Sequence, residues 1–147
     1  DQSVVIAAGS VYGNTMNAAE ILAGMLADRG VKNIKLYDVS NTHPSILVSE
    51  AFRCSHLVFA GSTYNNGIFT PMETVLLDLA AHNLQNRTVA LIENGTWAPV
   101  SGKLMRELVE KMKKTQILEP SITLRSSLKE EQLSALEALA DAIAQSL

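Results

Sequence analysis

The chain has 147 residues, of which 47% are hydrophobic and 18% charged, and its formal net charge is -3. This length and composition predict one ordinary globular domain with a sizeable core. The mild negative charge and the lack of a basic run argue against a nucleic-acid surface, and no apolar stretch is long enough to span a membrane. No secretory signal is visible, and the single cysteine, Cys54, cannot form an internal disulfide, so we expect a cytoplasmic protein.

The amino-terminal stretch predicts a strand, a short loop and a helix in succession. Val4–Ala8 is a continuous apolar run, as expected of a strand that is covered on both faces. From Thr15 onward, apolar residues follow helical spacing at Ala18, Ile21, Leu22, Met25 and Leu26. The segment between them is formed by Ser10, Val11, Tyr12, Gly13, Asn14 and Thr15, and it leads into a helix N-terminus whose free N–H groups suit a phosphate. The plainer interpretation is a tight strand-to-helix turn capped by Asn14 or Thr15.

Strands and helices continue to alternate along the chain. After a helix stop at 28–30, we expect strands at 34–39, 57–61 and 88–92, with 116–118 and 122–124 as candidates for a fifth strand that Pro120 could divide. Helices are expected at 46–53, from a capping box at 70–73, around 104–112, and from a second capping box at 127–130. The inner faces expected for the helix after residue 70 and for the last helix are Met72, Val75, Leu76 and Leu79, and Leu133, Leu136, Ala140 and Ile143.

This alternation predicts an α/β fold, a doubly wound sheet of five parallel strands in the order 2-1-3-4-5 with helices on both faces. In such sheets ligands bind beyond the carboxyl ends of the strands, at the switch point between strands one and three. The loops after strands one, three and four should therefore converge. The second of these loops contains Ser62, Thr63, Tyr64, Asn65, Asn66 and Gly67, and the third contains Asn94, Gly95, Thr96 and Trp97. Two aromatic side chains beside a phosphate site suggest a flat aromatic ligand.

Two common phosphate loops do not fit the first segment. A Walker loop needs Lys directly before its Ser or Thr, where this chain has Asn14, and the spacing of Gly9 and Gly13 does not match the dinucleotide fingerprint. The pattern Ser10-x-Tyr12-Gly13-Asn14-Thr15 resembles the phosphate loop of flavodoxins. All three segments resemble, in order, the FMN-binding loops of that family, and the resemblance extends over the whole chain.

A narrower resemblance concerns the second and third loops. Ser-Thr-Tyr-Asn-Asn-Gly-Ile-Phe-x-Pro and Glu-Asn-Gly-Thr-Trp-Ala-Pro are similar to the flavodoxin domain of flavodiiron proteins. That resemblance implies a β-lactamase-like domain with a two-iron site upstream, so that residues 1–147 would be a single FMN domain and a fragment of a larger chain. It also implies electron transfer from a rubredoxin-like or reductase donor to a di-iron site that reduces oxygen or nitric oxide. No residue of this chain is expected to bind metal or to act as a catalytic acid or base.

The resemblance also assigns roles to individual residues. Ser10–Thr15 would bind the FMN phosphate, and Asn94, Gly95 and Thr96 would meet the pyrimidine edge through backbone amides. Tyr64 would flank one face of the flavin and Trp97 the other face or the edge, unless these aromatics only cap the core. Asn65-Asn66 resembles the place where flavodoxins flip a peptide bond on reduction, although many of them have Gly at the first position. The plainer interpretation of that pair is an Asn-rich turn.

Other polar residues have simpler interpretations. Cys54 is expected to be buried packing, and Met105 and Met112 core filler. We expect His56 and His82 at the surface or as caps, Glu93 at a strand end with its carboxylate toward solvent, and Asp38 and Glu119 in solvated loop positions.

There are three alternatives to a flavodiiron domain. A free-standing flavodoxin carrier is often strongly acidic, so a net charge of -3 favours a tethered domain. A flavin-dependent quinone reductase usually has longer insertions, which are not evident here. A phosphoacceptor receiver domain needs an acidic pair after strand one and Asp at the end of strand three, where this chain has Gly9-Ser10 and Gly61.

Overall fold

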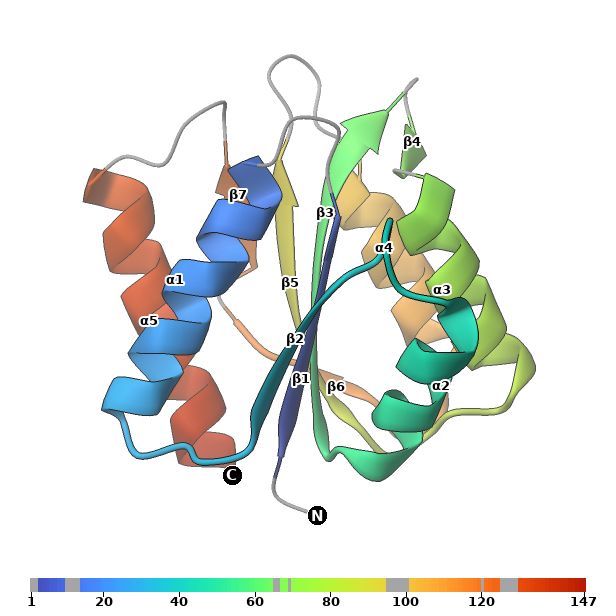
Figure 1. Ribbon diagram of the computed structural model, residues 1–147, viewed down its shortest axis with the longest axis horizontal. Helices are drawn as coiled ribbons and strands as arrows, with labels where there is room; N and C mark the ends of the chain where they lie inside the picture. Colours follow the sequence, from blue (N-terminus) through green and yellow to red (C-terminus); the bar gives the residue numbers. More distant parts are fainter. Residues whose placement is uncertain are drawn as a thin grey trace.

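The computed structural model describes residues 3–9, 14–64, 67–68, 70–94, 101–119, 121–124 and 130–147. The helices are α1 (Asn14–Asp28), α2 (Pro44–Arg53), α3 (Thr70–Ala81), α4 (Ser101–Glu110) and α5 (Glu130–Ser146). The strands are β1 (Val4–Gly9), β2 (Ile34–Asp38), β3 (His56–Tyr64), β4 (Gly67–Ile68), β5 (Thr88–Asn94), β6 (Gln116–Ile117) and β7 (Ile122–Leu124). These elements form one sheet with helices on each side of it (Figure 1).

The sheet has the order β2-β1-β3-β5-β6, and all of these strands pair in parallel. β7 also pairs in parallel with β5, at Ile92↔Ile122. The fifth strand is therefore divided into β6 and β7, with Pro120 between them. Because Pro cannot donate to a ladder, a break at this position is physically reasonable. The predicted order 2-1-3-4-5 is confirmed.

The helices cover both faces of the sheet, with α1 and α5 on one side and α2, α3 and α4 on the other (Figure 1). Side chains of a strand alternate between faces, and β1 shows both sets. Val4, Ile6 and Ala8 pack with α1 and α5, whereas Val5 and Ala7 pack with the other three helices. Burial on both faces explains why β1 is a continuous apolar run.

The helix ends follow local chemistry. Gly30 has φ of 85° and ends α1 in a Schellman motif, in which Val31 N–H donates to the Leu26 carbonyl and Gly30 N–H to that of Ala27. α2 begins two residues earlier than expected, because His43 acts as its N-cap through Nδ1, which accepts from Ser45 N–H at 3.1 Å.

The predicted inner face of α3 is confirmed, because Met72, Val75, Leu76 and Leu79 are all buried. In α5, Leu136, Ala140 and Ile143 are buried as expected, but Leu133 is exposed and Leu139 is buried instead. The expected capping residues 127–129 lie outside the described residues.

The expected loop at 62–69 is partly wrong. β3 continues to Tyr64 and then pairs antiparallel with β4, at Thr63↔Ile68 and Tyr64↔Gly67. The composition gave no sign that residues on either side of Asn65 and Asn66 pair with each other, and those two asparagines lie outside the described residues.

Candidate functional site

The carboxyl ends of β1, β3 and β5 lie at one edge of the sheet, at the top of Figure 1. Their register is close, because Gly9 pairs with Gly61 and Ser62 pairs with Asn94. The flanks of the three predicted loops are therefore adjacent, as the sequence predicted. Thr63, Tyr64 and Gly67 lie in the β3–β4 hairpin. The remaining predicted loop residues, Ser10–Gly13, Asn65–Asn66 and Gly95–Trp97, lie outside the described residues.

Thr15 is the predicted site residue whose side chain the structure places in most detail. It lies in the first turn of α1, which begins at Asn14, just after β1 ends at Gly9. Thr15 is fully buried, and its Oγ1 has no hydrogen-bond partner within the described part of the chain. A buried hydroxyl without a partner costs about 1–3 kcal/mol, so a group that accepts its proton would remove that penalty.

The charge at this helix start also differs from that of α3. The first turn of α3 carries Glu73, which suits the partial positive charge of a helix N-terminus. The first turn of α1 contains no acidic residue. Its amides and dipole are therefore not balanced by a carboxylate from the same turn, and an anion would supply that balance.

Beneath the edge, Gly61 allows two methionine side chains to approach β3. A Cβ at Gly61 would lie 3.3 Å from Met105 Sδ and 3.4 Å from Met72 Cγ. Both methionines are fully buried, which confirms the prediction that Met105 is core filler. Gly61 directly precedes Ser62–Gly67. The packing of the two methionines against Gly61 therefore holds in place the part of β3 that leads into the second predicted loop.

Glu93 lies near the end of β5 as expected, and its carboxylate forms a solvent-exposed hydrogen bond that the sequence did not predict. It is half-buried at the end of β5, and its Oε1 accepts a hydrogen bond from Thr123 Oγ1 of β7 at 2.9 Å. The cross-strand pairing of β5 with β7 brings the two residues together, and sequence spacing could not show this. Nearby, Glu119 is exposed and forms an ion pair with Arg106 of α4 at 3.1 Å.

Asp38 is not a solvated loop residue but the half-buried last residue of β2. Its two carboxylate oxygens accept hydrogen bonds from Ser40 N–H and Asn41 Nδ2, each at 2.9 Å. These bonds define an Asx-type turn after β2. The Asp38 carboxylate therefore stabilises this turn.

Cys54, His82 and His56 differ in their burial and in their hydrogen-bond partners. Cys54 is buried as predicted, at the end of α2. His82 caps α3, with Nδ1 2.7 Å from the Asp78 carbonyl oxygen. His56 is buried rather than at the surface, because it begins the central strand β3. Ser55 Oγ and Ser146 Oγ lie 2.7 and 2.8 Å from its two ring nitrogens, and burial lowers its pKa.

A charged cluster around Glu50 was not predicted from the sequence. Arg53 of α2 and Lys35 and Tyr37 of β2 all contact the Glu50 carboxylate. The hydrogen bonds from Arg53 hold the pKa of Glu50 at about 2. Desolvation is the main cause that raises the pKa of Tyr37, and the hydrogen bond to Glu50 raises it further. The sequence shows that Lys35, Glu50 and Arg53 carry opposite charges. It does not show that β2 lies close enough to α2 for them to form ion pairs.

The described residues contain no group of three or more His, Cys, Asp or Glu that could hold a metal ion. Among the same residues, no helix is both long and apolar enough to cross a membrane.

Comparison with known proteins gives a result for structure but not for sequence. No protein-family model matches the chain, and no curated protein matches it. Among solved structures, rubredoxin oxygen:oxidoreductase from Desulfovibrio gigas superposes with a TM-score of 0.92 at 23% identity, over 98% of this chain and 35% of that chain. The chain has the flavodoxin-like fold. A flavodoxin from the domain Archaea matches with a TM-score of 0.84 at 19% identity, over 99% of this chain and 98% of the other.

The same fold occurs in the flavodiiron protein from Giardia intestinalis, with a TM-score of 0.85 and 18% identity over 99% of this chain and 37% of that chain. This chain therefore spans about a third of the Desulfovibrio and Giardia proteins and nearly all of the archaeal flavodoxin. In the flavodoxin-like fold the carboxyl edge of the sheet is the expected ligand position, which is the edge where Thr15, Gly61 and Glu93 lie.

Proposed function

We propose that this chain is an FMN-binding electron-transfer domain that passes electrons to the di-iron site of a flavodiiron oxygen or nitric oxide reductase. The observation that carries the FMN part is the buried hydroxyl of Thr15 in the first turn of α1, which has no hydrogen-bond partner among the described residues. It lies at the carboxyl edge of a flavodoxin-like sheet and follows a segment that resembles a flavodoxin phosphate loop. A phosphate is the ligand that such a helix start favours.

The residues present fit FMN chemically. Ser10, Val11, Tyr12, Gly13, Asn14 and Thr15 would hold the phosphate through hydroxyls and backbone amides, without needing Lys or Arg. The other contacts would come from Ser62–Gly67 and Asn94–Trp97, with Tyr64 and Trp97 against the ring. When bound, the flavin supplies the redox chemistry, while the protein binds it, orients it and sets its electrostatic surroundings.

The identity of the parent protein rests on two observations. The second and third loops resemble those of flavodiiron proteins, and the chain superposes with a TM-score of 0.92 on part of a rubredoxin oxygen:oxidoreductase. A rubredoxin-like or reductase donor would then supply electrons. The alternative is a free-standing flavodoxin carrier, since the chain also superposes on an archaeal flavodoxin with a TM-score of 0.84.

Titration with FMN tests the binding proposal. The purified chain should bind FMN stoichiometrically and quench its fluorescence through Tyr64 and Trp97. Thr15→Val removes the hydroxyl at nearly constant shape, so it should weaken FMN binding about ten-fold, as for loss of one hydrogen bond to a charged group. Ser3→Ala is the matched control, because Ser3 Oγ is also buried without a hydrogen-bond partner in the described part of the chain, but Ser3 directly precedes β1, at the opposite edge of the sheet. No binding at micromolar FMN would overturn the proposal.

A second experiment separates the domain from the free carrier. The reduced, FMN-loaded chain is mixed without oxygen with a separately prepared β-lactamase-like di-iron domain, and flavin absorbance is followed. Faster flavin oxidation than with the same domain stripped of iron would support the flavodiiron assignment. Equal rates with both, together with rapid exchange with a soluble reductase, would favour the free-standing carrier.

A further inference from the structure

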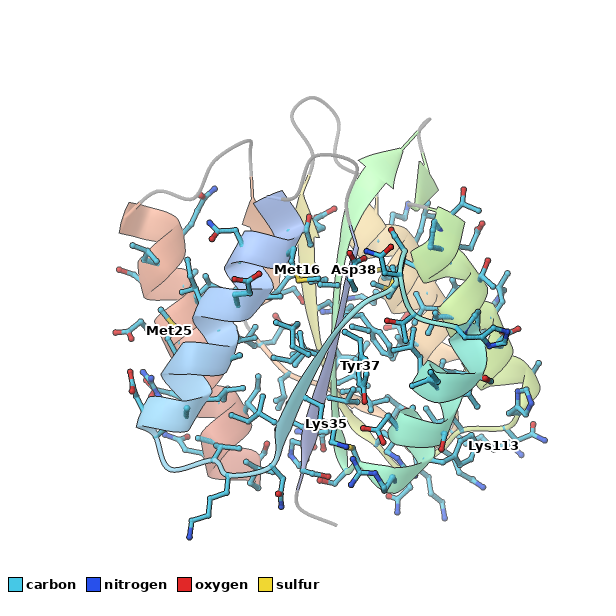
Figure 2. All side chains as sticks on the ribbon, in the orientation of Figure 1. Met16, Met25, Lys35, Tyr37, Asp38 and Lys113 are labelled. Atoms are coloured by element: carbon cyan, nitrogen blue, oxygen red, sulfur yellow. The ribbon has the colours of Figure 1, made fainter. Side chains whose placement is uncertain are left out.

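A polar pocket lies at the edge of the sheet where the parallel strands begin, opposite the candidate functional site. Six residues line it, and we call it the Ser3 pocket: Ser3, Lys32, Asn33, Ile34, Lys35 and Arg53. Its volume is about 240 Å³. Figure 2 shows Lys35 low on β2, whereas Asp38 lies at the other end of that strand, toward the carboxyl edge. The pocket is therefore separate from the candidate flavin site.

The charge of the Ser3 pocket is positive on a protein whose net charge is -3. Lys35 and Arg53 share the Glu50 carboxylate, at 3.4 Å and 2.8 Å from Oε2. Arg53 uses Nε and Nη2 for this, and its Nη1 has no hydrogen-bond partner in the described part of the chain. Lys32 forms no ion pair with any described residue. Among the described residues, the lining thus carries three cations, two of which share the Glu50 carboxylate.

The pocket also contains a buried hydroxyl that has no hydrogen-bond partner among the residues that the structure describes. Ser3 is 2% exposed, and its Oγ forms no hydrogen bond with the described residues. The backbone carbonyl of Ser3 accepts hydrogen bonds from His56 N–H at 3.1 Å and from Ser55 Oγ at 3.4 Å. Because Val5 and Ala7 face α2, alternation places the Ser3 side chain on the same face as Arg53 at the end of α2.

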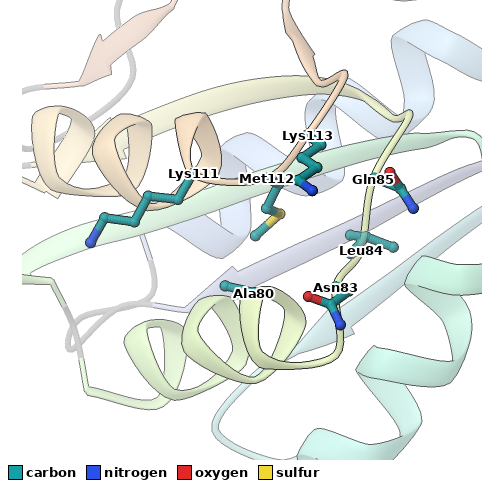
Figure 3. Close-up of a pocket in the computed structure, with 7 residues that line it drawn as sticks. All are labelled: Ala80, Asn83, Leu84, Gln85, Lys111, Met112 and Lys113. Carbon is teal, nitrogen blue, oxygen red and sulfur yellow. The ribbon is translucent and has the colours of Figure 1, made fainter.

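Another pocket that contains two lysines provides a comparison for the Ser3 pocket. This larger pocket, of about 330 Å³, is lined by Ala80, Asn83, Leu84, Gln85, Lys111, Met112 and Lys113 (Figure 3). It holds two lysines, but none of the buried, unpartnered side-chain atoms found among the described residues belongs to it. Its lysines follow the end of α4, where cations balance the helix dipole. The helix dipole therefore accounts for the lysines of the larger pocket. No such local feature accounts for the buried hydroxyl of Ser3.

We propose that the Ser3 pocket is an oxyanion site that binds a phosphate group. Phosphate carries about 1.5 to 2 negative charges at neutral pH, which complements the three cations of the lining. Its oxygens would accept hydrogen bonds from the Ser3 hydroxyl, the Lys32 ammonium and Arg53 Nη1. The proposal is independent of FMN binding, because it uses none of the residues of the candidate flavin site.

Amide NMR spectra of the full chain with saturating FMN test this site. Inorganic phosphate is added against sodium chloride at matched ionic strength, so that general screening cancels. We expect saturable shifts at the amides of Ser3, Lys32 and Asn33. Ser3→Ala and Lys32→Gln should each weaken the apparent affinity about ten-fold, as expected for loss of one charge-assisted hydrogen bond. Lys113→Gln, in the larger pocket, should leave it unchanged; Figure 2 shows Lys113 well apart from Lys35.

Each result decides the proposal. Shifts that fail to saturate, that occur equally with chloride, or that persist in Ser3→Ala and Lys32→Gln overturn it. Phosphate shifts confined to Thr15 and Met16 would indicate phosphate at the flavin edge and would also overturn it. If FMN itself does not bind, the amides of 32–33 still report on the Ser3 pocket, so failure of one proposal is distinguishable from failure of the other.

Discussion

Arg53 binds both carboxylate oxygens of Glu50, with Nε 2.9 Å from Oε1 and Nη2 2.8 Å from Oε2. Tyr37 OH also donates to Oε2, at 3.1 Å, so that the carboxylate connects α2 to the edge strand β2. Because the Glu50 side chain is only 11% exposed, this cluster is screened less by water than a surface ion pair.

The first prediction concerns acid stability. The pKa of Glu50 falls from 4.5 to about 2 on folding, chiefly through Arg53, so its contribution is present above pH 4.5 and is lost as pH falls toward 2. That contribution amounts to up to about 3 kcal/mol. Urea unfolding of Glu50→Gln should therefore show lower stability at neutral pH and a flatter pH dependence below pH 4.5. Glu137→Gln, from an exposed ion pair with Arg29, should change little, and an equal effect of the two variants would contradict the prediction.

His56 predicts a separate pH dependence. Burial lowers its pKa below 6.5 in the folded protein, so the unfolded state binds the extra proton. Stability from the neutral imidazole is therefore complete above pH 6.5 and decreases as the pH falls below that value. Thermal unfolding between pH 8 and 5 should show this slope in the wild type and lose it in His56→Gln. His82→Gln, at an exposed helix end, should keep the slope.

Two glycines, one inside α1 and one just after it, predict opposite outcomes on substitution. A Cβ added at Gly24, within α1, would meet no other atom within 4 Å, so Gly24→Ala should stabilise the protein by about 0.5–1 kcal/mol. Gly30 has φ of 85°, so Gly30→Ala should destabilise it by about 1–2 kcal/mol. Denaturant midpoints measure both changes. A loss of stability in Gly24→Ala would show that the helix face at this position is packed more tightly than the contacts indicate.

Gly61 links core packing to the candidate flavin site. A methyl group at this position would press on Met105 Sδ and Met72 Cγ, so Gly61→Ala should cost about 1–3 kcal/mol. The displaced end of β3 should also weaken FMN binding, because Ser62–Gly67 follows directly. Met105→Ala in the same background would relieve the crowding. If this double variant does not recover FMN affinity, the two effects are not coupled through the Gly61 contact.

Most of the sheet could be predicted because its strands are buried on both faces. Val4–Ala8 and 88–92 are almost wholly apolar, and a central parallel strand requires this. The apolar spacing in α3 gave its buried face correctly, since a helix next to a sheet has one inward stripe. β4 was missed because a two-residue strand exists only through pairing with Thr63 and Tyr64.

The polar contacts were harder to predict because they join residues that are distant in sequence. His56 has no burial signal of its own, and its partner Ser146 lies 90 residues away. Glu93 and Thr123 meet only because β5 and β7 pair. At the candidate site, the sequence indicated which strand ends lie together, but not that Thr15 would be buried without a hydrogen-bond partner among the described residues. That property depends on how α1 packs on the sheet.

Ser3 directly precedes β1, and the C-terminus lies at the same edge of the sheet, opposite the carboxyl edge (Figure 1). β3, with nine residues, separates the two edges by about 30 Å. A linker attached to either end would therefore start on the far side of the molecule from the predicted FMN loops. Anchoring the protein to an electrode by either end would direct those loops away from the surface, so direct electrochemistry would need a mobile mediator or a different attachment point.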